Sequence, residues 1–70
     1  MSSPGEVAII VHYQAVAGKG DEVAALLSRH TVATRAEPGC RDFVALRGVE
    51  DPDSFVLYER YESREALDRT

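Results

Sequence analysis

The first apolar cluster of the chain, VAIIVHYQ at residues 7–14, predicts a β-strand. Four of its positions are β-branched and a fifth is Tyr13, a composition typical of strands. Its first half is apolar on both faces, as in a strand that is covered on both sides. Since side chains alternate along a strand, one face carries Ile9, Val11 and Tyr13, and the other carries Ala8, Ile10, His12 and Gln14.

Beyond residue 20 the apolar spacing changes to that of a helix. Gly18-Lys19-Gly20 turns the chain, and the carboxylates of Asp21 and Glu22 suit the positive end of a helix dipole. One face of the predicted helix then carries Val23, Leu26, Leu27, His30 and Thr34. Pro38 disfavours helical geometry at the preceding residue and Gly39 offers permissive backbone, so the helix is expected to end there.

Two more strands are predicted at residues 41–49 and 54–61, joined as a hairpin by an Asp-Pro turn at 50–53. By alternation, Phe43, Ala45 and Arg47 share one face of the first, and Phe55, Leu57, Glu59 and Tyr61 share one face of the second. Ser63 is a suitable N-cap for a second helix that begins with REALDRT.

The order strand, helix, strand, strand, helix predicts an α+β fold of the ferredoxin-like, split βαβ type with an antiparallel sheet. That pattern calls for a longer second helix and a fourth strand, so the chain is expected to lack the last part of helix 2 and strand 4. We expect a single domain at residues 7–70, preceded by a flexible N-terminal tail at residues 1–6.

Composition limits the alternatives. Seventy residues form a small core, a single cysteine forms no internal disulfide, and no Cys/His cluster has zinc spacing. Oligomerisation is the remaining source of stability, and we expect a homodimer. The net charge of −4 with scattered basic residues argues against nucleic acid. No signal peptide or membrane span is visible, so we expect a cytoplasmic protein with no membrane partner.

Taken in order, the pieces VAGKGDE, ATRAEPGC, DFVAL, EDPD, FVLYERYES and EAL resemble the antibiotic biosynthesis monooxygenase family. The resemblance covers residues 7–67 and implies a ferredoxin-like subunit that pairs into a dimeric α/β barrel. It also implies a small apolar pocket between helices and sheet. Some family members oxidise phenolic or quinol-like substrates with O2 and no metal, flavin or haem. Others degrade haem or act on small signalling carbonyl compounds.

The resemblance therefore implies a cofactor-independent monooxygenase for a small aromatic metabolite. The alternatives are an isomerase or carbonyl-processing enzyme resembling the autoinducer-2 branch, and a non-catalytic dimeric ligand-binding or stress protein. Haem is disfavoured, because haem-degrading relatives use a tryptophan on the third strand. This chain has no tryptophan, and Tyr61 stands at that place.

Cofactor-free oxygenation needs a base, a partner for the substrate anion and a dry pocket. His30 is the first candidate base, since histidine titrates near neutral pH; the alternative is a histidine at the edge of the core. Glu59 and Tyr61 are further catalytic candidates, although Glu59 could instead pair with Arg47 or Arg35. The expected pocket is lined by Val11, Tyr13, Leu27, Phe43 and Leu57, for which plain packing is the alternative.

Two other chemically capable residues are assigned structural roles. His12 lies on the strand face opposite Val11 and Tyr13, which points to the dimer interface. Cys40 follows a helix C-terminus, whose negative dipole end disfavours a thiolate, and Arg41 projects to the other face. Cys40 is therefore predicted to pack at the junction of turn and strand.

Overall fold

The computed structural model of the chain describes residues 5–70. Residues 1–4 of the tail predicted at 1–6 lie outside the described residues. Glu6, at the end of that stretch, is half-buried, and its Oε1 accepts an ion-pair hydrogen bond from Arg60 Nη1 at 2.9 Å. The chain therefore contacts the sheet one residue before the first strand begins.

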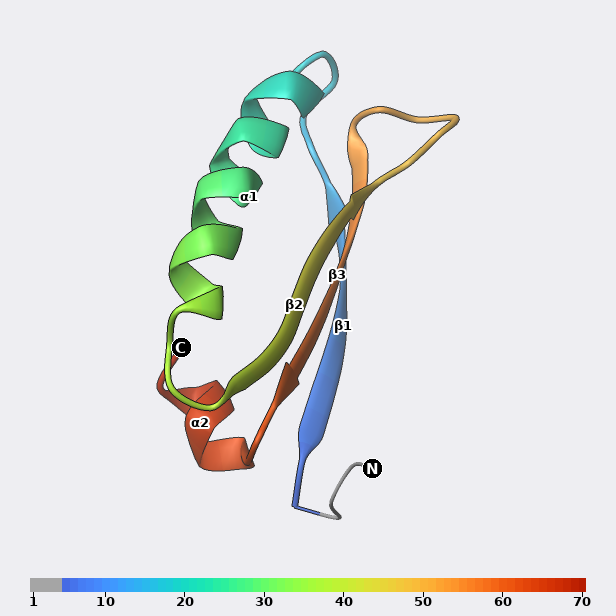
Figure 1. The fold of residues 1–70 in the computed structure, drawn as a ribbon. Coiled ribbons are helices and arrows are strands. Elements are labelled where there is room, and N and C mark those ends of the chain that lie inside the picture. The colour runs from blue at the N-terminus through green and yellow to red at the C-terminus, as the bar shows by residue number, and fades with distance from the viewer. Residues whose placement is uncertain (1–4) are drawn as a thin grey trace.

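Three strands and two helices follow in the predicted order. They are β1 (Val7–Gln14), α1 (Gly20–Arg35), β2 (Cys40–Arg47), β3 (Ser54–Tyr61) and α2 (Arg64–Asp68). The sheet has the order β1-β3-β2, and both pairings are antiparallel. In Figure 1, α1 runs alongside one face of the sheet, and α2 lies at the end where β3 leaves it. The α+β, ferredoxin-like prediction is confirmed.

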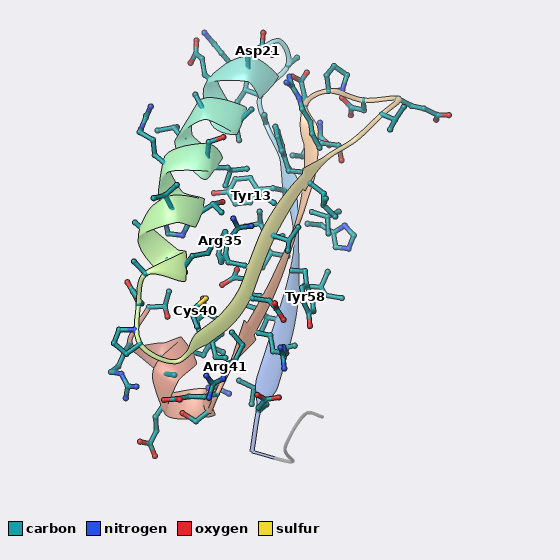
Figure 2. All side chains as sticks on the ribbon, in the orientation of Figure 1. Tyr13, Asp21, Arg35, Cys40, Arg41 and Tyr58 are labelled. Carbon is teal, nitrogen blue, oxygen red and sulfur yellow. The ribbon has the colours of Figure 1, made fainter. Side chains whose placement is uncertain are left out.

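The two faces of the sheet differ in burial. On the helix side, Phe43, Phe55, Leu57 and Tyr61 are all at most 6% exposed and form the core. The opposite face, which we call the open face, includes Ile10 at 65% and Leu46 at 56% exposed. The alternation predicted for all three strands therefore places each residue on the correct face. Figure 2 shows Tyr13 directed towards α1, and Tyr58 directed away from it.

The β2–β3 hairpin holds the start of α1. The Asp53 carboxylate accepts hydrogen bonds from the backbone N–H groups of Gly18 at 3.0 Å and Gly20 at 2.8 Å. Lys19, the residue before the helix, makes no side-chain cap of its own, so Asp53 supplies the oxygen that an N-cap residue ordinarily provides. A Cβ at Gly20 would overlap Asp53 and the carbonyl of Pro52, so glycine is required for this approach.

The predicted end of α1 and start of α2 are also found. Gly39 has a φ of +90°, and a Cβ there would meet the Ala66 side chain at 2.7 Å. The Ser63 hydroxyl accepts from the Ala66 N–H at 3.1 Å, as expected of an N-cap. Gly39 thus allows the chain to leave α1 and lets α2 pack closely against the turn.

Two details differ from the sequence prediction. β2 spans Cys40–Arg47 rather than 41–49, because the pairing of Gly48 N–H with Ser54 O at 2.8 Å closes the hairpin and Val49 lies outside the sheet, 99% exposed. Leu26, expected on the sheet-facing side of α1, is 58% exposed. The buried line of the helix passes through Gly20 and Thr34 instead, which places Leu26 on its flank.

Candidate functional site

A buried carboxylate and a buried phenol form the polar centre of the helix-side core. Tyr61 Oη donates a hydrogen bond to Glu59 Oε1 at 2.8 Å. Tyr61 is 1% exposed and Glu59 is 8% exposed. They lie two residues apart on β3, so their side chains leave the same face of the strand. The sequence placed them together, and the fold joins them directly.

The environment keeps Tyr61 a neutral donor. Burial, followed by the hydrogen bond to the Glu59 carboxylate, raises the pKa of Tyr61 from 10 to about 12. Tyr61 is therefore fully protonated across the neutral range, and its O–H is committed to Glu59.

The ion pair considered for Glu59 does not form among residues 5–70. Arg47 Nη2 instead pairs with Asp21 at 2.9 Å, and its Nε donates to Pro52 O at 2.6 Å. Arg35 Nε donates to the carbonyl of Phe43 at 2.9 Å. Both arginines are therefore held elsewhere, and the partner of Glu59 is the neutral phenol of Tyr61.

His30 lies on α1 above this centre. Its ring meets the Phe43 ring edge-on, with centroids 5.4 Å apart and planes at 77°. Its Nε2 is 3.4 Å from Oγ1 of the buried Thr34, one helical turn further on. His30 itself is exposed. One side of the ring is thus packed on an aromatic wall, and the residue stays open to solvent.

Phe43 connects His30 with the buried pair. It lies directly across from Glu59 in the β2–β3 register, and both side chains project to the helix side. His30, Phe43, Glu59 and Tyr61 therefore form a contiguous row from the surface of α1 into the core.

The five predicted pocket residues all lie between sheet and helix, but with different burial. Phe43 and Leu57 are buried, Val11 and Leu27 are half-buried, and Tyr13 is 49% exposed. Val11 and Leu57 are register partners, as are Tyr13 and Phe55. The β1 side of this layer is therefore its more open part.

Two cavities among the described residues lie away from His30, Glu59 and Tyr61. One of about 350 Å³ lies between α1 and β2 and includes Leu27, and another of about 320 Å³ includes Phe43. Neither is lined by Val11, Tyr13, Leu57 or the His30–Glu59–Tyr61 row. Arg35 borders both cavities. The sequence indicates Arg35 only as a possible partner of Glu59, and a charged residue near a helix C-terminus is ordinarily solvated.

Cys40 has the character of a packed thiol. It is half-buried, and its Sγ donates weakly to Asp42 O at 3.7 Å. Burial raises the pKa of the Cys40 thiol, and the negative charges of Glu59, Asp42 and Glu37 add to the effect. A thiol with a raised pKa is a poor nucleophile at neutral pH. The structure thus agrees with the junction role expected for Cys40.

Two further findings concern the described residues alone. Within 5–70, no group of three or more His, Cys, Asp and Glu side chains is arranged to hold a metal ion. In the same range, neither helix is long and apolar enough to cross a bilayer.

Comparison with known proteins assigns the chain to a family. The family model described as "Antibiotic biosynthesis monooxygenase" matches residues 6–69. The chain belongs to this family. It is 40% identical over 68 residues to the Mycobacterium tuberculosis protein named "Putative monooxygenase Rv0793", covering 97% of this chain and 64% of that protein.

Solved structures of family members share the fold. The Rv0793 structure matches with a TM-score of 0.81 at 36% identity, covering 90% of this chain and 63% of that one. The Nitrosomonas europaea protein named "Putative antibiotic biosynthesis monooxygenase" matches with a TM-score of 0.88 at 25% identity, covering 99% of this chain and 66% of that one. SnoaB of Streptomyces nogalater, a cofactor-independent oxygenase, matches with a TM-score of 0.82 at 20% identity, covering 93% and 65%, and so shows the fold alone. The chain spans a little under two thirds of the length of Rv0793.

Proposed function

We propose that the protein is a monooxygenase that oxidises a small phenolic or quinol-like metabolite with O2 and without a cofactor. Family membership supports an oxidoreductase, and a structural neighbour is a cofactor-independent oxygenase. The observation that carries the proposal is the row from the solvent-accessible His30 through Phe43 to the buried Glu59–Tyr61 pair. It combines a candidate base, an aromatic wall and a polar centre closed to water.

The proposed reaction is balanced by substrate and O2 alone. His30 takes the phenolic proton, and the phenolate transfers one electron to O2, giving a phenoxyl radical and superoxide. These combine to form a C–O bond, and the proton on His30 returns to make a hydroperoxide. Loss of the ring C–H proton with cleavage of the O–O bond yields a quinone and one water. The substrate supplies all four electrons.

Each residue of the row has one task. His30 is the catalytic base, because it carries the titratable nitrogen that a bound substrate can reach. The buried Phe43 ring packs edge-on against the His30 ring and keeps water from that side of the imidazole. Glu59 and Tyr61 are positioning residues, because their side chains bond to each other and so hold the part of the core beside Phe43 in one arrangement.

The test is O2 uptake by the purified protein with a panel of hydroquinones and hydroxynaphthalenes, with quinone formation followed by absorbance. We expect turnover in air and none under nitrogen. His30→Ala should lower kcat by roughly a hundredfold, a typical loss for a general base. His12→Ala is the matched control on the open face and should change kcat less than about twofold.

Three outcomes would contradict the proposal. Product formation under nitrogen would favour an isomerase or carbonyl-processing enzyme. Saturable binding of these compounds without turnover would favour a ligand-binding protein. Equal kcat for wild type and His30→Ala would remove His30 as the base.

We also propose that the protein works as a homodimer formed through the open face. The apolar side chains of Ile10 and Leu46 on this face are solvent-exposed, and a domain of this size gains stability by covering such a surface. Light scattering at micromolar concentration should give twice the chain mass. Ile10→Lys should shift it to one chain mass with unchanged circular dichroism. A folded wild-type monomer would overturn this proposal.

A further inference from the structure

A groove follows the outer edge of β2, on the flank of α1 that faces away from His30. Its main part has a volume of about 350 Å³ and lies between Thr31 and Val32 of α1 and Ala45 of β2. At 100° per residue, Thr31 and Val32 lie on one flank of the helix and Leu26 and His30 on the other. This β2-edge groove is therefore separate from the row that carries the proposed oxygenation.

The centre of the β2-edge groove is apolar. Thr31 Oγ1 donates to Leu27 O at 2.7 Å and Ser28 Oγ donates to Ala24 O at 2.9 Å, so both hydroxyls are directed at their own helix. Val32 is 71% exposed at the rim. Ala45 is a small residue, which gives the groove depth towards Phe55. These features favour an apolar ring or chain over a polar ligand.

One end of this groove presents the guanidinium of Arg35, which no carboxylate among residues 5–70 neutralises. Arg35 forms no ion pair within residues 5–70, whereas Arg47 at the other end pairs with Asp21, and Arg41 pairs with Glu62. Arg35 Nε donates to Phe43 O at 2.9 Å, which fixes the plane of the group and leaves Nη1 and Nη2 for another acceptor. Arg35 also borders the adjoining cavity of about 320 Å³.

We propose that the β2-edge groove binds a small organic carboxylate, whose carboxylate pairs with Arg35 and whose apolar body lies over Ala45 and Leu27. An oriented guanidinium suits a planar carboxylate, which can accept from both terminal nitrogens. The volume is at the lower end of that of ligand pockets, roughly 300–1,000 Å³, and fits one or two fused rings.

The same geometry argues against an added β-strand at this edge. A strand pairing with β2 would need the outward backbone acceptors of the edge, and the carbonyl of Phe43 is already bonded to Arg35. A side chain covering an edge in this way is a device that blocks strand addition. A compact anion needs only the free end of the guanidinium.

The test is a titration of the full 70-residue chain with 2-naphthoate, followed by the amide chemical shifts of each residue. We expect saturable shifts centred on Leu27, Thr31, Val32 and Ala45, with a dissociation constant on the order of a millimolar for so small a ligand. The neutral analogue 2-naphthalenemethanol and inorganic phosphate should each bind roughly tenfold more weakly. The alcohol lacks the carboxylate that pairs with Arg35, and phosphate lacks the apolar body that lies in the groove.

Variants separate charge from shape. Arg35→Gln should weaken 2-naphthoate roughly tenfold, whereas Arg29→Gln, an equal charge change at an exposed position of the same helix, should change it less than about twofold. Ala45→Leu places a larger side chain in the groove and should abolish binding while leaving the Arg35 guanidinium unchanged. Should Arg35→Gln unfold, Ala45→Leu and Arg35→Lys carry the test, and Arg35→Lys should retain part of the affinity.

Equal affinity for 2-naphthoate and its alcohol would overturn the proposal, as would equal effects of Arg35→Gln and Arg29→Gln. Shifts centred on Leu26 and His30 would assign the ligand to the oxygenation site instead. His30→Ala should leave 2-naphthoate binding unchanged, so this experiment tests binding in the groove independently of the proposed function.

Discussion

The two faces of strand β3 have different surroundings, and this contrast indicates which substitutions should affect stability most. Its helix-side residues are all buried, while the residues between them are all half-buried. The helix side combines apolar packing with one internal pair, Tyr61–Glu59. The open face combines apolar residues with partly exposed ion pairs of Arg60 to Asp42 at 2.6 Å and to Glu6 at 2.9 Å. The polar pair on the helix side is buried and bonded internally, whereas the ion pairs of Arg60 on the open face are partly exposed to solvent.

The comparison shows which interactions contribute most to the free energy of unfolding of this small domain. Burial of apolar and aromatic side chains contributes most on the helix side, where each lost contact leaves a cavity. Exposed ion pairs contribute little, because water and salt screen them. Substitutions that are alike in chemistry should therefore differ in effect according to the face.

The largest difference is expected between Phe43→Ala and Tyr58→Ala. Phe43 is 1% exposed, and its truncation should lower the free energy of unfolding by about 3–5 kcal/mol. Tyr58 is half-buried on the open face, and its truncation should cost about 1 kcal/mol in the monomer. Urea denaturation at low protein concentration measures both. Since Phe43→Ala can exceed the total stability of the domain, Phe43→Leu provides a graded version. Equal losses at the two positions would contradict the contrast.

An intermediate effect is expected for Tyr61→Phe. Removing the hydroxyl leaves the buried Glu59 without its donor, which should cost about 1–3 kcal/mol at neutral pH. The sign with pH follows from the raised pKa of Tyr61 in the fold, about 12. The folded chain holds this proton more tightly than the unfolded chain does, so the stabilisation is complete below pH 10. It is lost as the pH rises from 10 to about 12.

The measurement is the difference in unfolding free energy between wild type and Tyr61→Phe across that range. It should shrink from pH 10 upwards. Tyr58→Phe, on the open face, serves as the control for general alkaline effects. A constant difference up to pH 12 would mean that the phenol of Tyr61 is not shielded as the structure indicates.

The smallest effect is expected for Arg60→Met. Its ion pairs with Asp42 and Glu6 are partly exposed, so the loss should be about 0.5–1 kcal/mol in dilute salt and smaller still in 1 M NaCl. Urea denaturation at the two salt concentrations tests this. At the low protein concentration at which the chain is monomeric, a salt-independent loss above about 2 kcal/mol would contradict the partial exposure of these ion pairs.

Strand faces and element order were predictable, because the two-residue repeat of a strand and the 3.6-residue repeat of a helix are local properties. The same repeat placed Glu59 and Tyr61 together. It did not reveal that Tyr61, rather than Arg47 or Arg35, satisfies Glu59. The choice of partner depends on which side chains of different elements come into contact, and residue spacing does not determine these contacts.

The long-range contacts of the arginines and of Asp53 were likewise beyond sequence reasoning. Arg35 resembles any solvated residue near a helix end until the Phe43 carbonyl is placed beside it. Asp53 resembles an ordinary turn residue, although its carboxylate reaches residues 33 and 35 positions earlier. The turn was predictable from its amino acids, whereas the contact of Asp53 with the start of α1 depends on the complete fold.

The contact between Asp53 and the start of α1 has a consequence for local opening. The amide hydrogens of Gly18 and Gly20 exchange with solvent only when the hairpin moves away from the helix. Their exchange rates therefore report on the hairpin as well as on α1. The first turn of the helix and the β2–β3 loop should open as one cooperative unit, although Gly20 and Asp53 are 33 positions apart in the sequence.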